Sequence, residues 1–182
     1  MGYKIDLRKV AIAMSFGLAV GAPTLAYSDI ITMQMDGIPG ETAFAQKYDL
    51  PLDSIRVLTV GNSVKSAIDC SSGSCLNVIT VGNLTAVKNF GESSGPLFLL
   101  AVTGKAIKIA TISFYRAQDG LLTKYYTITV RNLYIASQKW VGNASGDKAD
   151  AESLELAFAQ IELLDNETGS KTCFDVKRKA TC

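Results

Sequence analysis

The sequence predicts an all-β domain, a sandwich or barrel of short strands with one short helix. Three observations support this fold class. Apolar and polar residues alternate with a period of two in several segments, turn residues separate those segments, and one segment carries helix start and stop signals. About 154 residues follow an N-terminal leader, enough for one core. Residues 29–182 are therefore expected to form a single domain.

The first half of this domain combines strands with turn-forming segments. Residues 31–35 alternate and are predicted to form a strand, and residues 36–41 contain two glycines and a proline that favour a turn. Residues 41–52 have no clear period and are expected to be irregular and extended. Residues 55–59 begin a second strand, and residues 61–75 are polar and are predicted to form a loop.

The middle of the chain contains the predicted helix and the most regular strands. Residues 76–81 are predicted to form a strand. Residues 96–104 start with proline and end with glycine, which is typical of one or two helical turns. Residues 106–116 and 122–136 alternate and are predicted to be strands, and Asp119-Gly120 between them is a hairpin signal.

The last part of the domain is predicted to be a strand followed by a tail. Residues 142–150 form a polar loop by composition. In residues 152–164 the apolar positions change parity after Phe158, so a strand with a bulge or bend is expected. A helix is the alternative for this segment, because it contains good helix formers. From about residue 166 the chain is a polar tail with two cysteines.

Residues 1–28 have the order of a secretory signal peptide: a basic head, an apolar core and a small-residue exit. The apolar core, residues 10–20, is shorter than the roughly 18–20 residues that span a bilayer. Cleavage is expected after Ala26 or Ser28, with no membrane attachment afterwards. The mature protein is therefore expected in the periplasm or outside the cell.

All four cysteines, Cys70, Cys75, Cys173 and Cys182, follow this leader, and an even number in an exported chain indicates disulfides. Three pairings are open, of which the most local joins Cys70 to Cys75 and Cys173 to Cys182. Bonds between subunits and free thiols are alternatives. A zinc site is a weak alternative, because these spacings are not usual for zinc ligands.

Composition argues against several functions. The net charge of +1 becomes about −1 when the leader, with three basic residues and one acid, is removed, so nucleic-acid binding is not expected. The chain has no histidine, which excludes histidine-dependent triads. Glu152, Glu155 and Glu162 could be read as paired carboxylates, but a solvated strand face is the preferred interpretation. No catalytic residue, cofactor site or metal site is predicted, and no enzymatic activity is expected.

Aromatic residues gather around the long predicted strand 122–136. Core packing or a subunit contact is the preferred interpretation for them, and a stacking ligand site is the alternative. They are Tyr125, Tyr126, Tyr134 and Trp140.

The ordered segments of the mature chain resemble the Hcp (haemolysin-coregulated protein) family of type VI secretion tubes. The resembling segments are residues 33–41, 52–60, 79–89, 94–110, 124–137 and 152–164. The family's opening turn resembles Asp36, Gly37, Gly40 and Glu41 here. The resemblance implies a β-barrel of two packed sheets with one short helix, and it favours a strand for residues 152–164. It also implies hexameric rings that stack into hollow tubes, which carry effector proteins and are not enzymes.

Two features depart from that family. Type VI tube proteins assemble in the cytoplasm without a cleaved leader, whereas this chain carries a leader and four cysteines. The leading hypothesis is therefore an exported Hcp-like subunit that self-assembles into rings, a tube or an extracellular filament. The alternative is a monomeric or single-ring binding module that carries an effector or partner protein.

Overall fold

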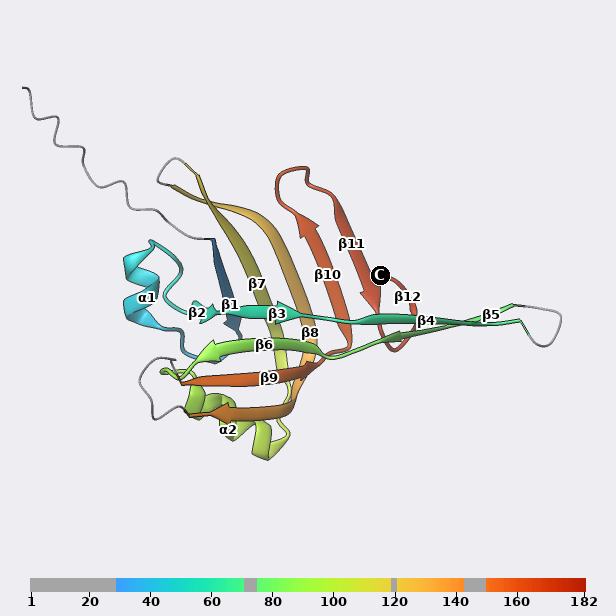
Figure 1. Ribbon diagram of the computed structural model, residues 1–182, viewed down its shortest axis with the longest axis horizontal. Helices are drawn as coiled ribbons and strands as arrows, with labels where there is room; N and C mark the ends of the chain where they lie inside the picture. The colour runs from blue at the N-terminus through green and yellow to red at the C-terminus, as the bar shows by residue number, and fades with distance from the viewer. Residues whose placement is uncertain (1–28, 71–74, 119–120, 143–149) are drawn as a thin grey trace, which may run out of the picture.

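The computed structural model describes residues 29–70, 75–118, 121–142 and 150–182 (Figure 1). The predicted leader, the hairpin signal at residues 119–120 and most of the polar loop 142–150 lie outside these ranges. In the described ranges, no helix is long and apolar enough to cross a membrane.

The described chain is mostly strand, with two short helices where the sequence predicts one. The helices are α1 (Thr42–Lys47) and α2 (Ser94–Thr103). The strands are β1 (Ile30–Met35), β2 (Ile55–Val57), β3 (Thr59–Gly61), β4 (Val64–Asp69), β5 (Leu76–Val81), β6 (Leu84–Asn89), β7 (Ile107–Gln118), β8 (Leu121–Val141), β9 (Ala151–Ala157), β10 (Gln160–Asp165), β11 (Lys171–Asp175) and β12 (Ala180–Thr181).

Ten strands form one antiparallel sheet that folds into two layers. The first layer has the order β12-β11-β10-β8-β7-β1-β2, and the second has the order β3-β6-β9-β8. In Figure 1 the strands of the two layers run across one another, the arrangement of orthogonal sheet packing. Buried side chains from both layers, including Met33, Ile112 and Leu154, form one core between them. The predicted fold class is confirmed, although the sheet does not close on itself within the described residues.

The long strand β8 belongs to both layers, because it bends. Its pairing register with β9 shifts between Ile135 and Ser137, and Asn132 has a positive φ of 50°. The partner segment also breaks, since β9 ends at Ala157 and β10 begins at Gln160. The bend that the parity change predicts is therefore confirmed, and it carries the chain from one layer to the other.

Helix α2 confirms the prediction from proline and glycine. Pro96 lies in its first turn, and Gly104 ends it in the left-handed conformation with φ 60°. Helix α1 was not predicted, and the expected irregular segment 41–52 is wrong there. This six-residue helix is too short to be stable alone. Its buried Ala45 packs with Ile30 of β1, so tertiary contact supports it.

The prediction of a polar loop over residues 61–75 is also wrong, because β4 occupies most of its first half. β4 and β5 form a separate two-stranded sheet, which we call the arm. Figure 1 shows the arm projecting far beyond the two layers. The tail is ordered too: β11 pairs with β10, and β12 pairs with β11.

Candidate functional site

The predicted turn motif, Asp36, Gly37, Gly40 and Glu41, lies together between β1 and α1. Gly37 has a φ of 77°, which glycine adopts at little cost. A Cβ atom on Gly40 would overlap the backbone of Asp53, so only glycine fits there. The turn is therefore pressed against the segment that precedes β2.

The Glu41 carboxylate lies between the backbone of β2 and a side chain of β6. One carboxylate oxygen accepts a hydrogen bond from the backbone N–H of Arg56 at 3.4 Å. The other lies 3.8 Å from the Nζ atom of Lys88, on β6. A Cβ on Gly91 would come within 3.0 Å of the same carboxylate oxygen, so this glycine leaves space for it.

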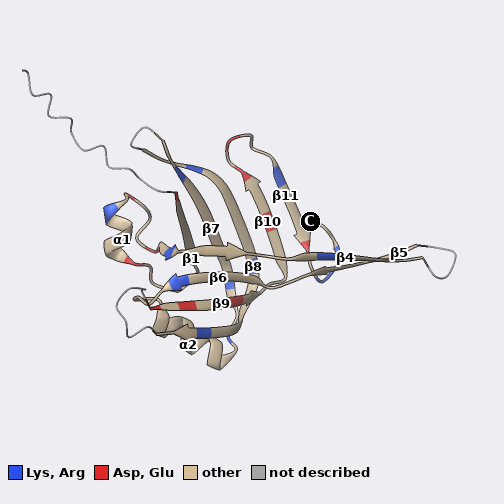
Figure 2. Cartoon of the chain, viewed as in Figure 1, with Lys and Arg blue, Asp and Glu red and all other residues tan. Residues whose placement is uncertain are grey.

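Lys88 and Glu152 form a buried ion pair inside the second layer. They face each other in the register of β6 and β9, strands whose opposite charges are visible in Figure 2. Both side chains are 0% exposed, and Nζ lies 2.7 Å from the Oε1 atom of Glu152. Lys88 also donates to the backbone carbonyl of Asn89 at 2.6 Å and to the Oγ atom of Ser94 at 3.3 Å. All three ammonium protons therefore have acceptors.

The carboxylate of Glu152 is also fully engaged. The hydroxyl of Ser94, the first residue of α2, donates to Oε1 at 2.8 Å. The side-chain amide of Gln138, on β8, donates to Oε2 at 2.7 Å. We call Glu41, Lys88, Ser94, Gln138 and Glu152 the polar network. It joins the opening turn, three strands and the start of α2.

The two carboxyl groups of the polar network have pKa values shifted in opposite directions. Burial raises the pKa of Glu41 above its ordinary value of 4.5, and the charge of Lys88 offsets only part of this. Burial also acts to raise the pKa of Glu152. The hydrogen bonds from Lys88, Ser94 and Gln138 together outweigh it and hold that pKa below the ordinary value. The ammonium group of Lys88 therefore stabilises the charged form of Glu152 more strongly than that of Glu41, in line with its shorter distance of 2.7 Å to Glu152 and 3.8 Å to Glu41.

This arrangement is suited to holding structure. Both members of the Lys88–Glu152 pair have protein groups as hydrogen-bond partners, which fix their side chains in place. In the described part of the chain, no group of three or more histidine, cysteine, aspartate or glutamate residues could hold a metal ion.

The preferred interpretation of the glutamates is wrong for Glu152, which is buried and not on a solvated face. The alternation of residues along the strands could have indicated this burial. Glu152 shares its parity with Leu154 and Leu156, and Lys88 shares its parity with Leu84 and Ala86, all of which are buried. Glu155 and Glu162 form ion pairs 3.9 and 2.9 Å long with lysines that are themselves exposed.

The four cysteines form two local disulfides. Cys70 is bonded to Cys75 across the end of the arm, with Cα atoms 4.1 Å apart. Cys173 of β11 is bonded to Cys182, with Cα atoms 5.3 Å apart. The most local of the three predicted pairings is therefore the one in the structure. Both disulfides lie on projecting or peripheral elements and not in the core.

Among the described residues, two groups of exposed apolar side chains form surfaces of interest. The helix patch consists of Phe98, Leu99 and Val102 on α2 and Trp140 on β8, and its two aromatic rings lie 5.3 Å apart. On the arm, Val64, Ile68 and Val78 are each more than half exposed. The interpretation of Trp140 as a core residue is wrong, because it is 55% exposed. A subunit contact and a stacking ligand site both stay predictions for Trp140.

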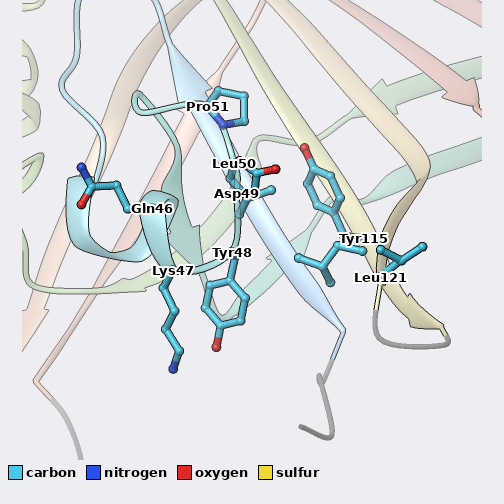
Figure 3. A pocket seen from close by; sticks show the side chains of 9 residues that line it. Gln46, Lys47, Tyr48, Asp49, Leu50, Pro51, Tyr115 and Leu121 are labelled. Carbon is cyan, nitrogen blue, oxygen red and sulfur yellow. The ribbon is translucent and has the colours of Figure 1, made fainter. Parts of the chain in front are cut away.

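A cavity of about 350 Å³ lies between α1 and the ends of β7 and β8 (Figure 3). Tyr48, Tyr115 and Leu121 line it. A second cavity of about 360 Å³ also has Tyr48 in its lining, together with Phe44, Phe114 and Tyr125. Tyr125 and Phe114 have ring centroids 6.2 Å apart. Aromatic residues thus gather at this end of the first layer as well.

Solved structures with this fold come from several bacteria. Hcp1 of Salmonella typhimurium superposes with a TM-score of 0.71 at 23% identity, covering 86% of this chain and 100% of that one. A mutant Hcp1 of E. coli EAEC 042 gives 0.68 at 19% identity, covering 83% and 99%. Secreted protein Hcp3 of Pseudomonas aeruginosa gives 0.61 at 14% identity, covering 81% and 96%. At these identities the likeness shows the fold.

The sequence itself places the chain in a family. A comparison with curated proteins gave no match. The family model described as "Type VI secretion system effector, Hcp" matches residues 32–164, most of the described domain. The match begins in β1, includes the whole polar network and ends within β10. The chain belongs to the Hcp family of type VI secretion system proteins.

Proposed function

We propose that the mature protein is a non-enzymatic, exported subunit that self-assembles into rings, hexameric as in its family, and that these rings stack into a tube or filament. One observation supports this most directly. The folded chain leaves apolar side chains exposed on two separate surfaces, the helix patch and the arm. Exposed apolar surfaces of this kind mark sites of association.

Two different surfaces are what a ring requires. A closed ring uses a head-to-tail interface, in which one surface of each subunit meets a different surface of the next. The arm projects from one part of the molecule, and the helix patch lies on α2 and the end of β8 (Figure 1). We propose that these two surfaces contribute to contacts between copies of the chain.

Export is the part of the proposal that departs from the family. The leader predicted over residues 1–28 supports it, and so do the two disulfides, which form in oxidising compartments. We propose that assembly takes place in the periplasm or outside the cell. A contractile sheath in the cytoplasm could not propel a tube that assembled on the other side of the inner membrane.

Carriage of an effector or partner protein by a single ring or monomer is the second candidate. The two cavities that Tyr48 helps to line favour it, because aromatic side chains are enriched where proteins bind partners. It would leave the exposed apolar surfaces partly uncovered unless the partner occupies them. Self-assembly therefore remains the preferred function.

Negative-stain electron microscopy and sedimentation velocity of residues 29–182, without reductant, test the proposal. Rings or tubes are expected. The variants Ile68→Lys on the arm and Leu99→Lys on the helix patch should reduce assembly at least tenfold. Leu52→Lys, which changes a residue of similar exposure outside both surfaces, should not. Circular dichroism checks that each variant is folded. Monomeric wild-type protein would overturn self-assembly and favour the second candidate.

A further inference from the structure

The arm has little support of its own. It is a two-stranded sheet that, within the described residues, pairs with no other strand. Isolated two-stranded hairpins are marginally stable in water. At its root the N–H of Gly82 donates to the carbonyl of Ser63 at 2.7 Å, and the side-chain amide of Asn62 donates to the carbonyl of Gly82 at 2.9 Å. These contacts close the root but do not fix the direction in which the arm points.

The tail lies against the root of the arm. Phe174, Val176 and Lys179 of the tail line a cavity of about 220 Å³ together with Ile79 and Val81 of β5 and their neighbour Thr80. Ile79 and Val81 are half-buried, whereas Val78 is 51% exposed. Besides the continuation of the arm into the paired strands β3 and β6, the tail is the element placed to limit movement of the arm at its root.

The part of the tail that faces the arm is a turn held by several hydrogen bonds. Asp175 accepts a hydrogen bond from the N–H of Arg178 at 2.8 Å and another from the side chain of Gln160 at 3.0 Å. The N–H of Val176 donates to the carbonyl of Ala159 at 2.9 Å. Lys179 has a positive φ of 54°, which turns the chain back toward β11. The bonds to Ala159 and Gln160 tie the first part of the turn to the start of β10, whereas Lys179 immediately precedes β12 and depends on how that strand is held.

The return strand that completes this turn depends on the disulfide. β12 has two residues, paired with Phe174 and Asp175 of β11. Two residue pairs are too few to hold a strand in place without further support. The Cys173–Cys182 bond supplies that support, assisted by a hydrogen bond from the N–H of Cys182 to the carbonyl of Cys173 at 3.3 Å.

We propose that the Cys173–Cys182 disulfide is a redox-controlled brace for the arm. When the bond is formed, the turn at residues 175–179 supports the root of the arm. When both thiols are reduced, β12 separates, the Lys179 side of the turn loosens and the arm can change direction. Formation removes two electrons and two protons from the thiols and transfers them to a disulfide oxidant, a thiol-exchange protein or small molecule, which becomes a dithiol.

The brace would couple assembly to the compartment. Inside the cytoplasm the thiols stay reduced and the arm is unsupported. After export the bond forms and the arm takes the direction that contact with another copy requires. This consequence rests on the proposed function, because it assumes that the arm makes contacts between copies of the chain.

Hydrogen exchange measured by mass spectrometry tests the brace. In the background Cys70→Ser/Cys75→Ser, the tail disulfide is the only bond that dithiothreitol can reduce. Reduction should accelerate exchange at residues 79–81 by about tenfold while leaving β7 unchanged. The matched chain, Cys173→Ser/Cys182→Ser, should show fast exchange at residues 79–81 with and without dithiothreitol. Acceleration confined to residues 171–181 would overturn the brace and leave a local staple.

A second variant tests the contact without touching the disulfide. Val176→Ser keeps both cysteines and should reproduce a several-fold acceleration at residues 79–81; no acceleration would overturn the contact between turn and arm. Sedimentation of the same samples separates the brace from the function. If wild-type protein never assembles but the exchange results hold, the brace stands and the proposed self-assembly fails.

Discussion

The buried ion pair of the polar network offers the sharpest test of how this fold is held together. Substitution of Lys88 by methionine removes the cation and leaves the Glu152 carboxylate in a site with 0% exposure. Removing one partner of a buried pair costs about 3–5 kcal/mol, mainly because the remaining charge is uncompensated. For a domain of about 150 residues this lowers Tm by roughly 6–20 °C.

Urea unfolding followed by far-ultraviolet circular dichroism, with the disulfides intact, measures this loss. Lys171→Met is the matched control, because Lys171 pairs with Glu162 at 2.9 Å but is 57% exposed. Exposed pairs contribute about 0–1 kcal/mol. The two substitutions delete the same charge, so a difference of several kcal/mol between them isolates the effect of burial.

The double variant Lys88→Met/Glu152→Gln separates the orphaned charge from the lost contact. It removes both charges and keeps a side chain that can bond to Ser94 and Gln138, so it should be more stable than Lys88→Met alone. The loss in Lys88→Met should also shrink as the pH falls, because without Lys88 less remains to offset the effect of burial, so the Glu152 carboxyl is protonated more readily than in the wild type. Equal losses in Lys88→Met and Lys171→Met, or a double variant less stable than Lys88→Met, would refute this account.

Three further predictions concern the turn, the carboxyl groups and the tail. Gly40→Ala should destabilise the fold by more than about 2 kcal/mol in thermal unfolding, because the added Cβ would overlap the backbone of Asp53. The control Gly95→Ala in α2 should be neutral or stabilising, because no atom lies within 4 Å of the added Cβ there. In ¹³C NMR titration, Glu41 should titrate above 4.5 and Glu152 below it, and the reverse order would contradict the network. Because the pKa of Glu152 is lowered in the folded state, its contribution to stability is present above pH 4.5 and is lost as the pH falls through the folded pKa. The pKa of Glu41 is raised in the folded state, so ionisation of this group costs stability as the pH rises above 4.5. Denatured, unreduced mature protein should contain almost no free thiol, and loss of the Cys173–Cys182 bond, which spans 9 positions, should cost about 2–3 kcal/mol in urea unfolding.

Local patterns predicted most of the strands. Alternation placed β1, β7 and β8, because a strand with one face toward the core must repeat every second residue. The proline and glycine around α2 marked its limits, because their backbone preferences act within a few residues. The change of parity after Phe158 predicted the bend between β9 and β10.

Prediction failed where the local sequence was ambiguous and contacts with residues distant in the sequence determined the secondary structure. Residues 41–52 have no clear period, yet α1 forms there because Ala45 packs against Ile30. The polar composition of residues 61–75 indicated a loop, but cross-strand pairing with residues 76–81 made β4 a strand. Residues 64–68 of β4 are exposed, so this strand shows little apolar alternation to detect.

The sequence by itself determined the β-rich class, the position of α2, the even set of cysteines and, through its ordered motifs, membership of the Hcp family. Tertiary structure alone decided which glutamate is buried, which cysteines are bonded and which apolar residues stay outside. Lys88 and Glu152 are separated by 64 positions and become partners only because β6 and β9 lie side by side. Burial and charge pairing depend on such long-range neighbours, whereas strand and helix periods depend on the adjacent few residues.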